Sequence, residues 1–318
     1  MEREDSQNIE SRTGRLFGDL WHKLDNEQFG QSVDLFAKRF EANGFDLSWF
    51  EGKQCLDVGC GGGRYTIAMG RMGASRAVGC DLSEDGLADA RARAAGMANV
   101  TFEQASALDM PFDDESFDFV CCSGVLHHTT DAEKGLDELT RVLRPGGKLY
   151  LLLYGSGGLR WAASGALRPM AQELGYGFMD RAVEKAGLPA NNRRNFLDDF
   201  FVPIVTFVDW ETLRGRLTTR GFGKIERWEK GRFDHEANPG LQCEEIEKMV
   251  RIFQAAAELA EGGNRTLADR GLATARDFLA QTQAQIVAHE KGDISQAELE
   301  QAVIGDGNHR VLAVKGGA

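Results

Sequence analysis

Long apolar runs and excess positive charge are both missing from this sequence of 318 residues. No stretch approaches the roughly 18 consecutive apolar residues of a membrane-spanning helix, and the polar start MEREDSQNIESRTGR is not that of a secretory signal peptide. Lysine and arginine number 37 against 49 aspartates and glutamates, which gives a net charge of −12. Because an acidic surface is repelled by phosphate backbones, we expect no nucleic-acid partner, no membrane span and a cytoplasmic location.

Paired cysteines and metal-binding spacings are absent as well. None of the six cysteines forms a C-x-x-C pair, and no H-x-x-x-H pattern occurs. Most of the cysteines fall in or beside apolar segments, as buried reduced thiols do. We therefore expect no disulfide, no zinc site and no metal requirement.

Short apolar or β-branched runs alternate with helical patterns from residue 54 onward. This alternation predicts an α/β fold, a Rossmann-like seven-stranded and mostly parallel sheet with helices on both faces. Ser83 is the expected N-cap of the helix after the second strand. A helical insertion and C-terminal helices complete the prediction. The expected strands are 54–59, 76–82, 99–105, 117–124, 147–155, 221–231 and 308–317.

Three glycines follow the first strand in CLDVGCGGGRYT, residues 55–66. Glycine after a buried strand allows a tight turn and brings backbone N–H groups, with the positive end of the next helix, against a ligand. A dinucleotide loop would place a third glycine where this chain has Arg64, which counts against NAD. The loop therefore suits a ligand without phosphates.

A carboxylate at the end of the second strand, Asp81, lies 22 positions after Gly59. Such a side chain can accept hydrogen bonds from both ribose hydroxyls. Its alternative role is to cap the following helix, but Ser83 already fills that place. The two features together indicate an adenosine-containing ligand at the carboxyl ends of the first two strands.

Five motifs in order make the sequence resemble the class I S-adenosylmethionine-dependent methyltransferases. They cover roughly residues 54–153, and the similarity is greatest to the branch with the quinone-biosynthesis C-methyltransferases and many natural-product methyltransferases. The motifs are LDVGCGGGR, GCDLS, ASALDMPFDDESFDFV, SGVLHH and RVLRPGGKLYL.

The resemblance implies S-adenosylmethionine as cofactor, S-adenosylhomocysteine as product, and a set of binding residues. The glycine loop would approach the methionyl part, Asp57 would order the loop and the ammonium group, Asp81 would bind the ribose, and the residues after the third strand would border the adenine. Relatives commonly carry an acidic residue where this chain has Ser106, although Asp109 lies nearby. The expected cofactor residues are Trp21, Asp57, Gly59, Cys60, Gly61, Asp81, Leu82, Ser106, Ala107 and Ser123.

Histidines supply the candidates for a general base. His127 and His128 follow the fourth strand, where an acceptor would meet the methyl group, and at most one of two adjacent loop histidines can face it. His235, beside Asp234, is a further candidate. For each of them a structural role is the alternative. The segment RRNFLDDFFVP, residues 193–203, either contacts the acceptor or packs the insertion through its phenylalanines.

We interpret the chain as four segments, in which the segment LFGDLWHKLD, residues 16–25, resembles the aromatic lid of relatives. The expected activity is methyl transfer by in-line displacement to a small-molecule acceptor with an O, N, S or C nucleophile. The alternatives are a non-catalytic partner subunit and an enzyme that uses the same cofactor for non-methyl chemistry. The C-terminal helices would form a homodimer contact or a wall of the acceptor site. The segments are a lid at 1–50, a core at 51–155, a substrate-binding insertion at 156–220, and the last strands with a helical block at 221–318.

Overall fold

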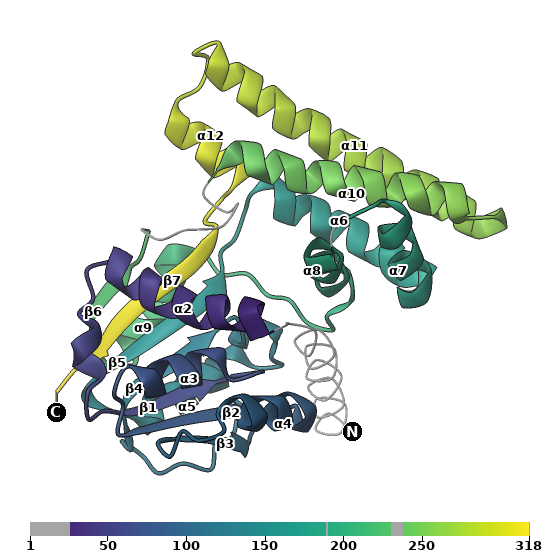
Figure 1. Cartoon of the computed structure of the whole chain (residues 1–318). Coiled ribbons are helices and arrows are strands. Elements are labelled where there is room, and N and C mark those ends of the chain that lie inside the picture. The colour runs from purple at the N-terminus through teal and green to yellow at the C-terminus, as the bar shows by residue number, and fades with distance from the viewer. Residues whose placement is uncertain (1–25, 189, 230–237, 318) are drawn as a thin grey trace. The chain divides into compact units, whose positions relative to one another are not determined.

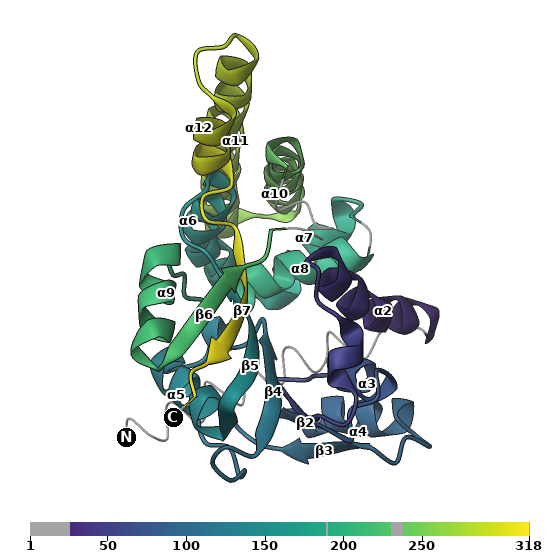
Figure 2. The ribbon, with the colours of Figure 1, turned by 90° about the vertical axis from the view of Figure 1, so that its left-hand side faces the viewer.

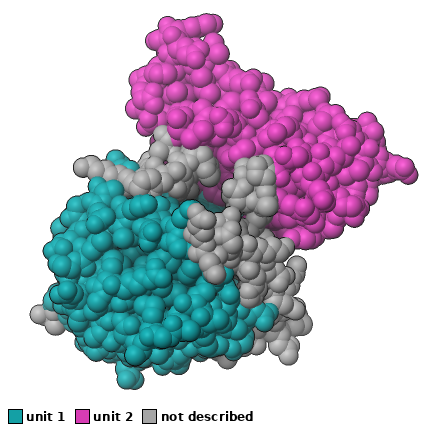
Figure 3. All heavy atoms as spheres, viewed as in Figure 1, with its two compact units in different colours: residues 1–154, 203–232, 308–318 teal, residues 155–202, 233–307 magenta. Residues whose placement is uncertain are grey.

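The computed structural model describes residues 26–188, 190–229 and 238–317 (Figure 1). Within them the chain divides into two compact units (Figure 3). Unit 1 contains residues 1–154, 203–232 and 308–318, and unit 2 contains residues 155–202 and 233–307. The division into four functional segments stays a prediction. The expected lid residue Trp21 and the candidate base His235 lie outside the described residues.

Unit 1 is built on a seven-stranded sheet with the order β3-β2-β1-β4-β5-β7-β6. The neighbours from β3 to β5 pair in parallel, whereas β7 is antiparallel to both β5 and β6. The prediction of a mostly parallel sheet is therefore confirmed. The strands are β1 (Gln54–Val58), β2 (Arg76–Asp81), β3 (Val100–Gln104), β4 (Phe117–Ser123), β5 (Leu143–Tyr154), β6 (Phe222–Arg227) and β7 (Asn308–Lys315).

Helices cover both faces of this sheet because its central strands are apolar on both sides. In β1, Cys55 points into one buried cluster and Leu56 into the other, as the two-residue period of a strand requires. The first cluster joins the sheet to α2, η1, α3 and α4, and the second joins it to α5 and α9 (Figure 2). The elements are α2 (Asn26–Ala42), η1 (Leu47–Phe50), α3 (Arg64–Arg71), α4 (Glu84–Arg93), η2 (Leu126–His128), α5 (Ala132–Val142) and α9 (Trp210–Thr219).

Two local predictions have different outcomes. Ser83 is the N-cap of α4, and its hydroxyl accepts a hydrogen bond from the Gly86 N–H at 3.2 Å, as expected. The fifth strand begins earlier than predicted, at Leu143 rather than 147. Leu143 pairs with Phe117 before the register of the two strands shifts, so the Pro-Gly-Gly turn forms an irregularity within the strand instead of preceding it.

Unit 2 is helical in its described residues. Its core consists mainly of alanine, leucine and phenylalanine side chains, among them Phe196, Phe200 and Phe253. The predicted C-terminal helices are α10 and α11, which pack along each other, and a short α12 that the sequence pattern had not predicted follows them. The helices are α6 (Leu159–Leu174), α7 (Tyr176–Lys185), α8 (Ala190–Phe201), α10 (Pro239–Leu259), α11 (Gly262–Glu290) and α12 (Gln296–Val303).

Candidate functional site

The predicted site residues of unit 1 gather where β1, β2 and β4 end. These strands are parallel neighbours, with Val58 beside Cys80 on one side and beside Cys122 on the other. Their carboxyl ends therefore meet at one edge of the sheet. In open α/β sheets this is the edge at which ligands bind.

The glycine loop after β1 is held against the end of β2 by its own backbone. The N–H groups of Gly59 and Cys60 both donate to the Cys80 carbonyl oxygen, at 2.8 and 3.0 Å. Gly59 has a φ of 69°, and a Cβ there would lie 2.3 Å from the Val125 side chain. A side chain at this position would collide with the segment after β4 as well as strain the backbone. These two constraints explain why position 59 is a glycine.

Asp81 is fixed by two backbone donors, one for each carboxylate oxygen. Oδ2 accepts from the Gly61 N–H and Oδ1 from the Ser83 N–H, both at 2.9 Å. Burial raises the pKa of this carboxyl, against the lowering effect of the backbone hydrogen bonds. Across residues 26–188, 190–229 and 238–317, no lysine or arginine forms an ion pair with Asp81. Each oxygen accepts one of these two backbone N–H groups, and the carboxylate keeps capacity to accept from further donors.

Asp57, on β1, links the loop to the start of α3. Its Oδ2 accepts from the Thr66 N–H at 2.9 Å and from the Thr66 hydroxyl at 2.8 Å. The side chain is buried. Burial raises its pKa to about 6, although the Thr66 hydrogen bonds and the charge of Arg64 oppose the shift. The carboxylate thus orders the first turn of the helix and provides negative charge beneath the glycine loop.

The other predicted cofactor residues lie around this pair. Cys60 is buried, whereas Leu82 is among the exposed large apolar side chains. The segment after β3 is joined to β2, since the Ala105 N–H donates to the Asp81 carbonyl oxygen at 3.0 Å. The Ser106 hydroxyl that follows accepts from the Leu108 N–H at 3.1 Å. The structure therefore brings the loop, the end of β2 and the start of the 106–114 segment together.

Ala107 and Ser123 complete the set of predicted cofactor residues that the structure describes. Ala107 is buried in the second apolar cluster. Ser123 is half-buried at the end of β4 and pairs with Leu152 of β5. It therefore lies between the glycine loop and the histidines that follow β4.

The buried ring of His127 stacks on the half-buried ring of Tyr154 at the end of β5. The two ring centroids are 3.7 Å apart with an interplanar angle of 20°. Neither ring nitrogen of His127 has a hydrogen-bond partner in the described part of the chain. Burial, together with the neighbouring His128, holds the pKa of His127 well below its usual range. This imidazole is therefore neutral near pH 7.

His128 has a defined tautomer. Its Nδ1 lies 2.8 Å from the carbonyl oxygen of Ile204. Since a carbonyl oxygen can only accept, Nδ1 carries the proton in the neutral ring and Nε2 carries the basic lone pair. The two adjacent histidines therefore differ in chemistry, and His128 has the geometry of an oriented base.

Sequence reasoning missed the segment that orients these histidines, residues 203–208. Besides Ile204, its Thr206 N–H donates to the His127 carbonyl oxygen at 2.9 Å, and its Val208 N–H donates to the Tyr154 carbonyl oxygen at 3.1 Å. The only local signal is Pro203, which follows the helical pattern of α8 and begins an apolar stretch. Nothing in that signal points to residues some eighty positions earlier.

The charged and aromatic stretch at 193–203 is largely internal to unit 2. Phe196 and Phe200 belong to its apolar core. Asp199 forms an ion pair with Arg160, and its carbonyl oxygen accepts from Arg168 at 2.7 Å. These side chains pack the helices against one another.

The described residues contain neither a metal centre nor a membrane-spanning helix. No group of three or more His, Cys, Asp or Glu side chains there is arranged to hold a metal ion. No helix in that part of the chain has the length and apolar character needed to cross a bilayer.

The sequence is similar to known methyltransferases. Residues 56–151 match a family model described as a methyltransferase domain. The demethylmenaquinone methyltransferase of Clavibacter sepedonicus is 33% identical over 176 residues, which are 55% of this chain and 67% of that enzyme. The demethylmenaquinone methyltransferase of Staphylococcus aureus strain MRSA252 is 37% identical over 109 residues, 34% of this chain and 45% of that enzyme. This chain thus spans less than half of the staphylococcal enzyme.

An S-adenosylmethionine-dependent methyltransferase from Mesorhizobium loti is 24% identical, with a TM-score of 0.41 over 60% of this chain and 85% of that one.

Proposed function

This chain belongs to the class I S-adenosylmethionine-dependent methyltransferases, and from that premise we propose that its acceptor is a small molecule bound beside β4 and β5. The two relatives named above are demethylmenaquinone methyltransferases. The observation that carries the proposal is the half-buried Tyr154 ring, which stacks on the buried His127 ring and lies next to the oriented His128. A partly exposed aromatic ring of this kind suits an apolar or aromatic acceptor ring.

We propose that the cofactor lies on the β1–β2 side of the edge. Asp81 would accept the ribose hydroxyls, the loop backbone at Gly59–Gly61 would contact the methionyl part, and Asp57 would provide charge for the ammonium group. Ser106 and Ala107 would border the adenine, and the Ser123 carbonyl would face the methionyl part. Cys60 and Leu82 would complete the wall.

When bound, S-adenosylmethionine supplies a methyl group on a positively charged sulfur, which is already activated. The work left to the chain is to orient the acceptor, to exclude water and to remove a proton where the nucleophile has one. Orientation alone can contribute on the order of 7 kcal/mol. We propose that Nε2 of His128 accepts the proton of the acceptor's nucleophile. This nitrogen is unprotonated in the neutral ring, because the Ile204 carbonyl oxygen holds the ring's own proton on Nδ1.

The test is a methyl-transfer assay with methyl-labelled S-adenosylmethionine and a panel of quinols, phenols and amines, read by mass spectrometry. The expected result is a labelled acceptor heavier by one methylene together with S-adenosylhomocysteine. Parallel calorimetric titrations with S-adenosylmethionine, S-adenosylhomocysteine and NAD report on binding separately. Tight binding of the adenosyl compounds without any labelled acceptor would favour a non-catalytic subunit, and a changed acceptor without label would favour non-methyl chemistry.

A further inference from the structure

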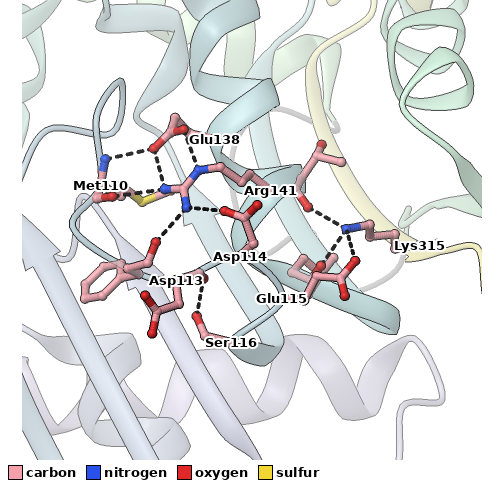
Figure 4. A network of polar contacts seen from close by, with 11 residues as sticks. Met110, Asp113, Asp114, Glu115, Ser116, Glu138, Arg141 and Lys315 are labelled. Carbon is pink, nitrogen blue, oxygen red and sulfur yellow. Dashed lines mark hydrogen bonds and ion pairs between the residues drawn. The ribbon is translucent and has the colours of Figure 1, made fainter.

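Arg141, in the last turn of α5, uses every N–H donor that it has. A guanidinium group carries five N–H donors. Two of them bond the carboxylate of Glu138, at 2.8 and 2.9 Å. The other three bond the Met110 carbonyl oxygen at 3.0 Å, the Phe112 carbonyl oxygen at 2.6 Å and the Asp114 carboxylate at 2.8 Å (Figure 4).

Arg141 and Glu138 together hold residues 106–114, a segment without regular secondary structure. Glu138 adds a bond of its own, since its Oε2 accepts from the Met110 N–H at 2.8 Å. Both backbone polar groups of Met110, which is buried, are thus bonded by side chains of α5. The hydrogen bonds from Arg141 lower the pKa of Glu138, so both side chains are charged. Charge-assisted bonds of this kind are the stronger class of hydrogen bond.

The same segment begins at the site. At its start, the Ala105 N–H donates to the carbonyl oxygen of Asp81. At its far end, the backbone of Met110 and Phe112 is fixed by α5. Between these anchors lie Ser106 and Ala107, so the position of their backbone depends on both anchors.

We propose that Arg141 and Glu138 are positioning residues for adenine recognition, because they set the backbone that borders the base. This inference depends on the proposed placement of the adenine beside Ser106 and Ala107. The two residues need not touch the cofactor. Lysine cannot replace Arg141, since an ammonium group has three donors and lacks the planar fork that reaches two carbonyls and two carboxylates together.

The experiment measures base discrimination rather than affinity alone. The wild-type protein and Arg141→Ala are titrated with S-adenosylhomocysteine and with S-inosylhomocysteine, which carries a carbonyl oxygen in place of the adenine amino group. Loss of a hydrogen bond to the base is expected to make the wild type prefer the adenosyl compound by about tenfold. We expect Arg141→Ala to bind the adenosyl compound about tenfold more weakly and to show almost no preference. Arg141→Lys should behave like Arg141→Ala.

Arg220→Ala is the matched control. Arg220, the C-cap residue of α9, also bonds two acidic side chains of α5, Glu133 and Asp137, but within the described residues it makes no bond to the 106–114 segment. Its removal should leave the preference intact. An equal loss of affinity for both compounds in Arg141→Ala, with the preference kept, would overturn the proposal and make the pair merely structural.

A second variant covers the case in which Arg141→Ala does not fold. Glu138→Gln keeps the size of the side chain and removes its charge, and it should lower the preference in the same direction. An unchanged preference in folded Glu138→Gln would also overturn the proposal. If the wild type itself binds S-adenosylhomocysteine without preferring it over the inosyl compound, the proposed adenine placement fails instead.

Discussion

At the carboxyl ends of the strands, the half formed by β1 and β2 is polar and bonded to residues nearby in the sequence. The half formed by β4 and β5 is aromatic and assembled from distant parts of the chain. In the first half, Asp81 bonds N–H groups of Gly61 and Ser83, which lie within twenty residues of it. In the second, Ile204 reaches His128 across 76 positions, and Tyr154 supports His127 through ring stacking.

This difference suits the two tasks of a transferase. In the proposed arrangement, the cofactor would be held by backbone amides and carboxylates whose geometry one short motif can specify. The acceptor would be met by rings and by a segment that enters from another part of the chain.

The largest expected effect concerns the two histidines. In His128→Ala, turnover should fall by about 10²–10⁴-fold, the usual contribution of a general base. His127→Phe keeps a ring to stack on Tyr154 and removes a base that is already weak, so its turnover should fall much less. Affinity for S-adenosylhomocysteine should be the same in both variants and the wild type. Steady-state kinetics with the identified acceptor and calorimetry measure the two quantities. Equal losses of turnover, or loss of cofactor binding in His128→Ala, would contradict the assignment.

A smaller effect, on binding rather than turnover, is expected in the other half. Asp81→Ala should weaken binding of S-adenosylmethionine by roughly 1.5–3 kcal/mol, the contribution of hydrogen bonds to a charged group. Calorimetry of the folded variant measures the loss. Asp85→Ala is the control, because Asp85 is an exposed carboxylate four residues further along, in the first turn of α4. Unchanged affinity in Asp81→Ala would contradict the proposal that Asp81 binds the ribose.

The pH dependence of binding should separate Asp57 from Asp81. The pKa of buried Asp57 is raised to about 6, so this side chain becomes protonated as the pH falls through that value. Only the ionised form attracts the ligand's ammonium group. Affinity for S-adenosylhomocysteine should therefore be constant above pH 6 and fall by up to about tenfold per pH unit below it.

Asp57→Asn should bind more weakly at pH 7 and lose most of this dependence. A remaining slope would belong to Asp81, whose pKa is also raised by burial. Binding by the wild type that is independent of pH between 5 and 7 would place the ammonium group away from Asp57.

The contrast between the halves also explains what the sequence could predict. Strands β1, β2, β4, β5 and β7 were predictable because each contains a short apolar run, and the glycine loop with Asp81 was predictable because the contacts are local. The start of β5 was wrong by four residues, since the pairing of Leu143 with Phe117 is a tertiary contact that overrides the Pro-Gly-Gly signal. His128 was named from its position in a motif, but its partner Ile204 carries no local signal. The 106–114 segment, which we propose borders the adenine, is intermediate, because it lies within one motif while the Arg141 that holds it lies in another.

The smallest expected effect tests whether the two halves differ in stability or only in chemistry. Each contains a helix that begins with a side-chain cap: the Ser83 hydroxyl accepts from the Gly86 N–H, and the Asp131 carboxylate accepts from the Lys134 N–H at 2.9 Å. Ser83→Ala and Asp131→Ala should each lower the free energy of unfolding by about 1 kcal/mol.

Urea denaturation measures this loss, provided that the m value, the slope of the unfolding free energy against urea concentration, is the same in the variants and the wild type. Affinity for S-adenosylhomocysteine should be unchanged in both variants, since alanine at position 83 keeps the N–H that bonds Asp81. A loss of affinity in Asp131→Ala would show that the start of α5 influences the β1–β2 half. The two halves would then be coupled through that helix. Equal losses of stability without any change in binding would show that the halves share one scaffold and differ only in the groups that they present at its edge.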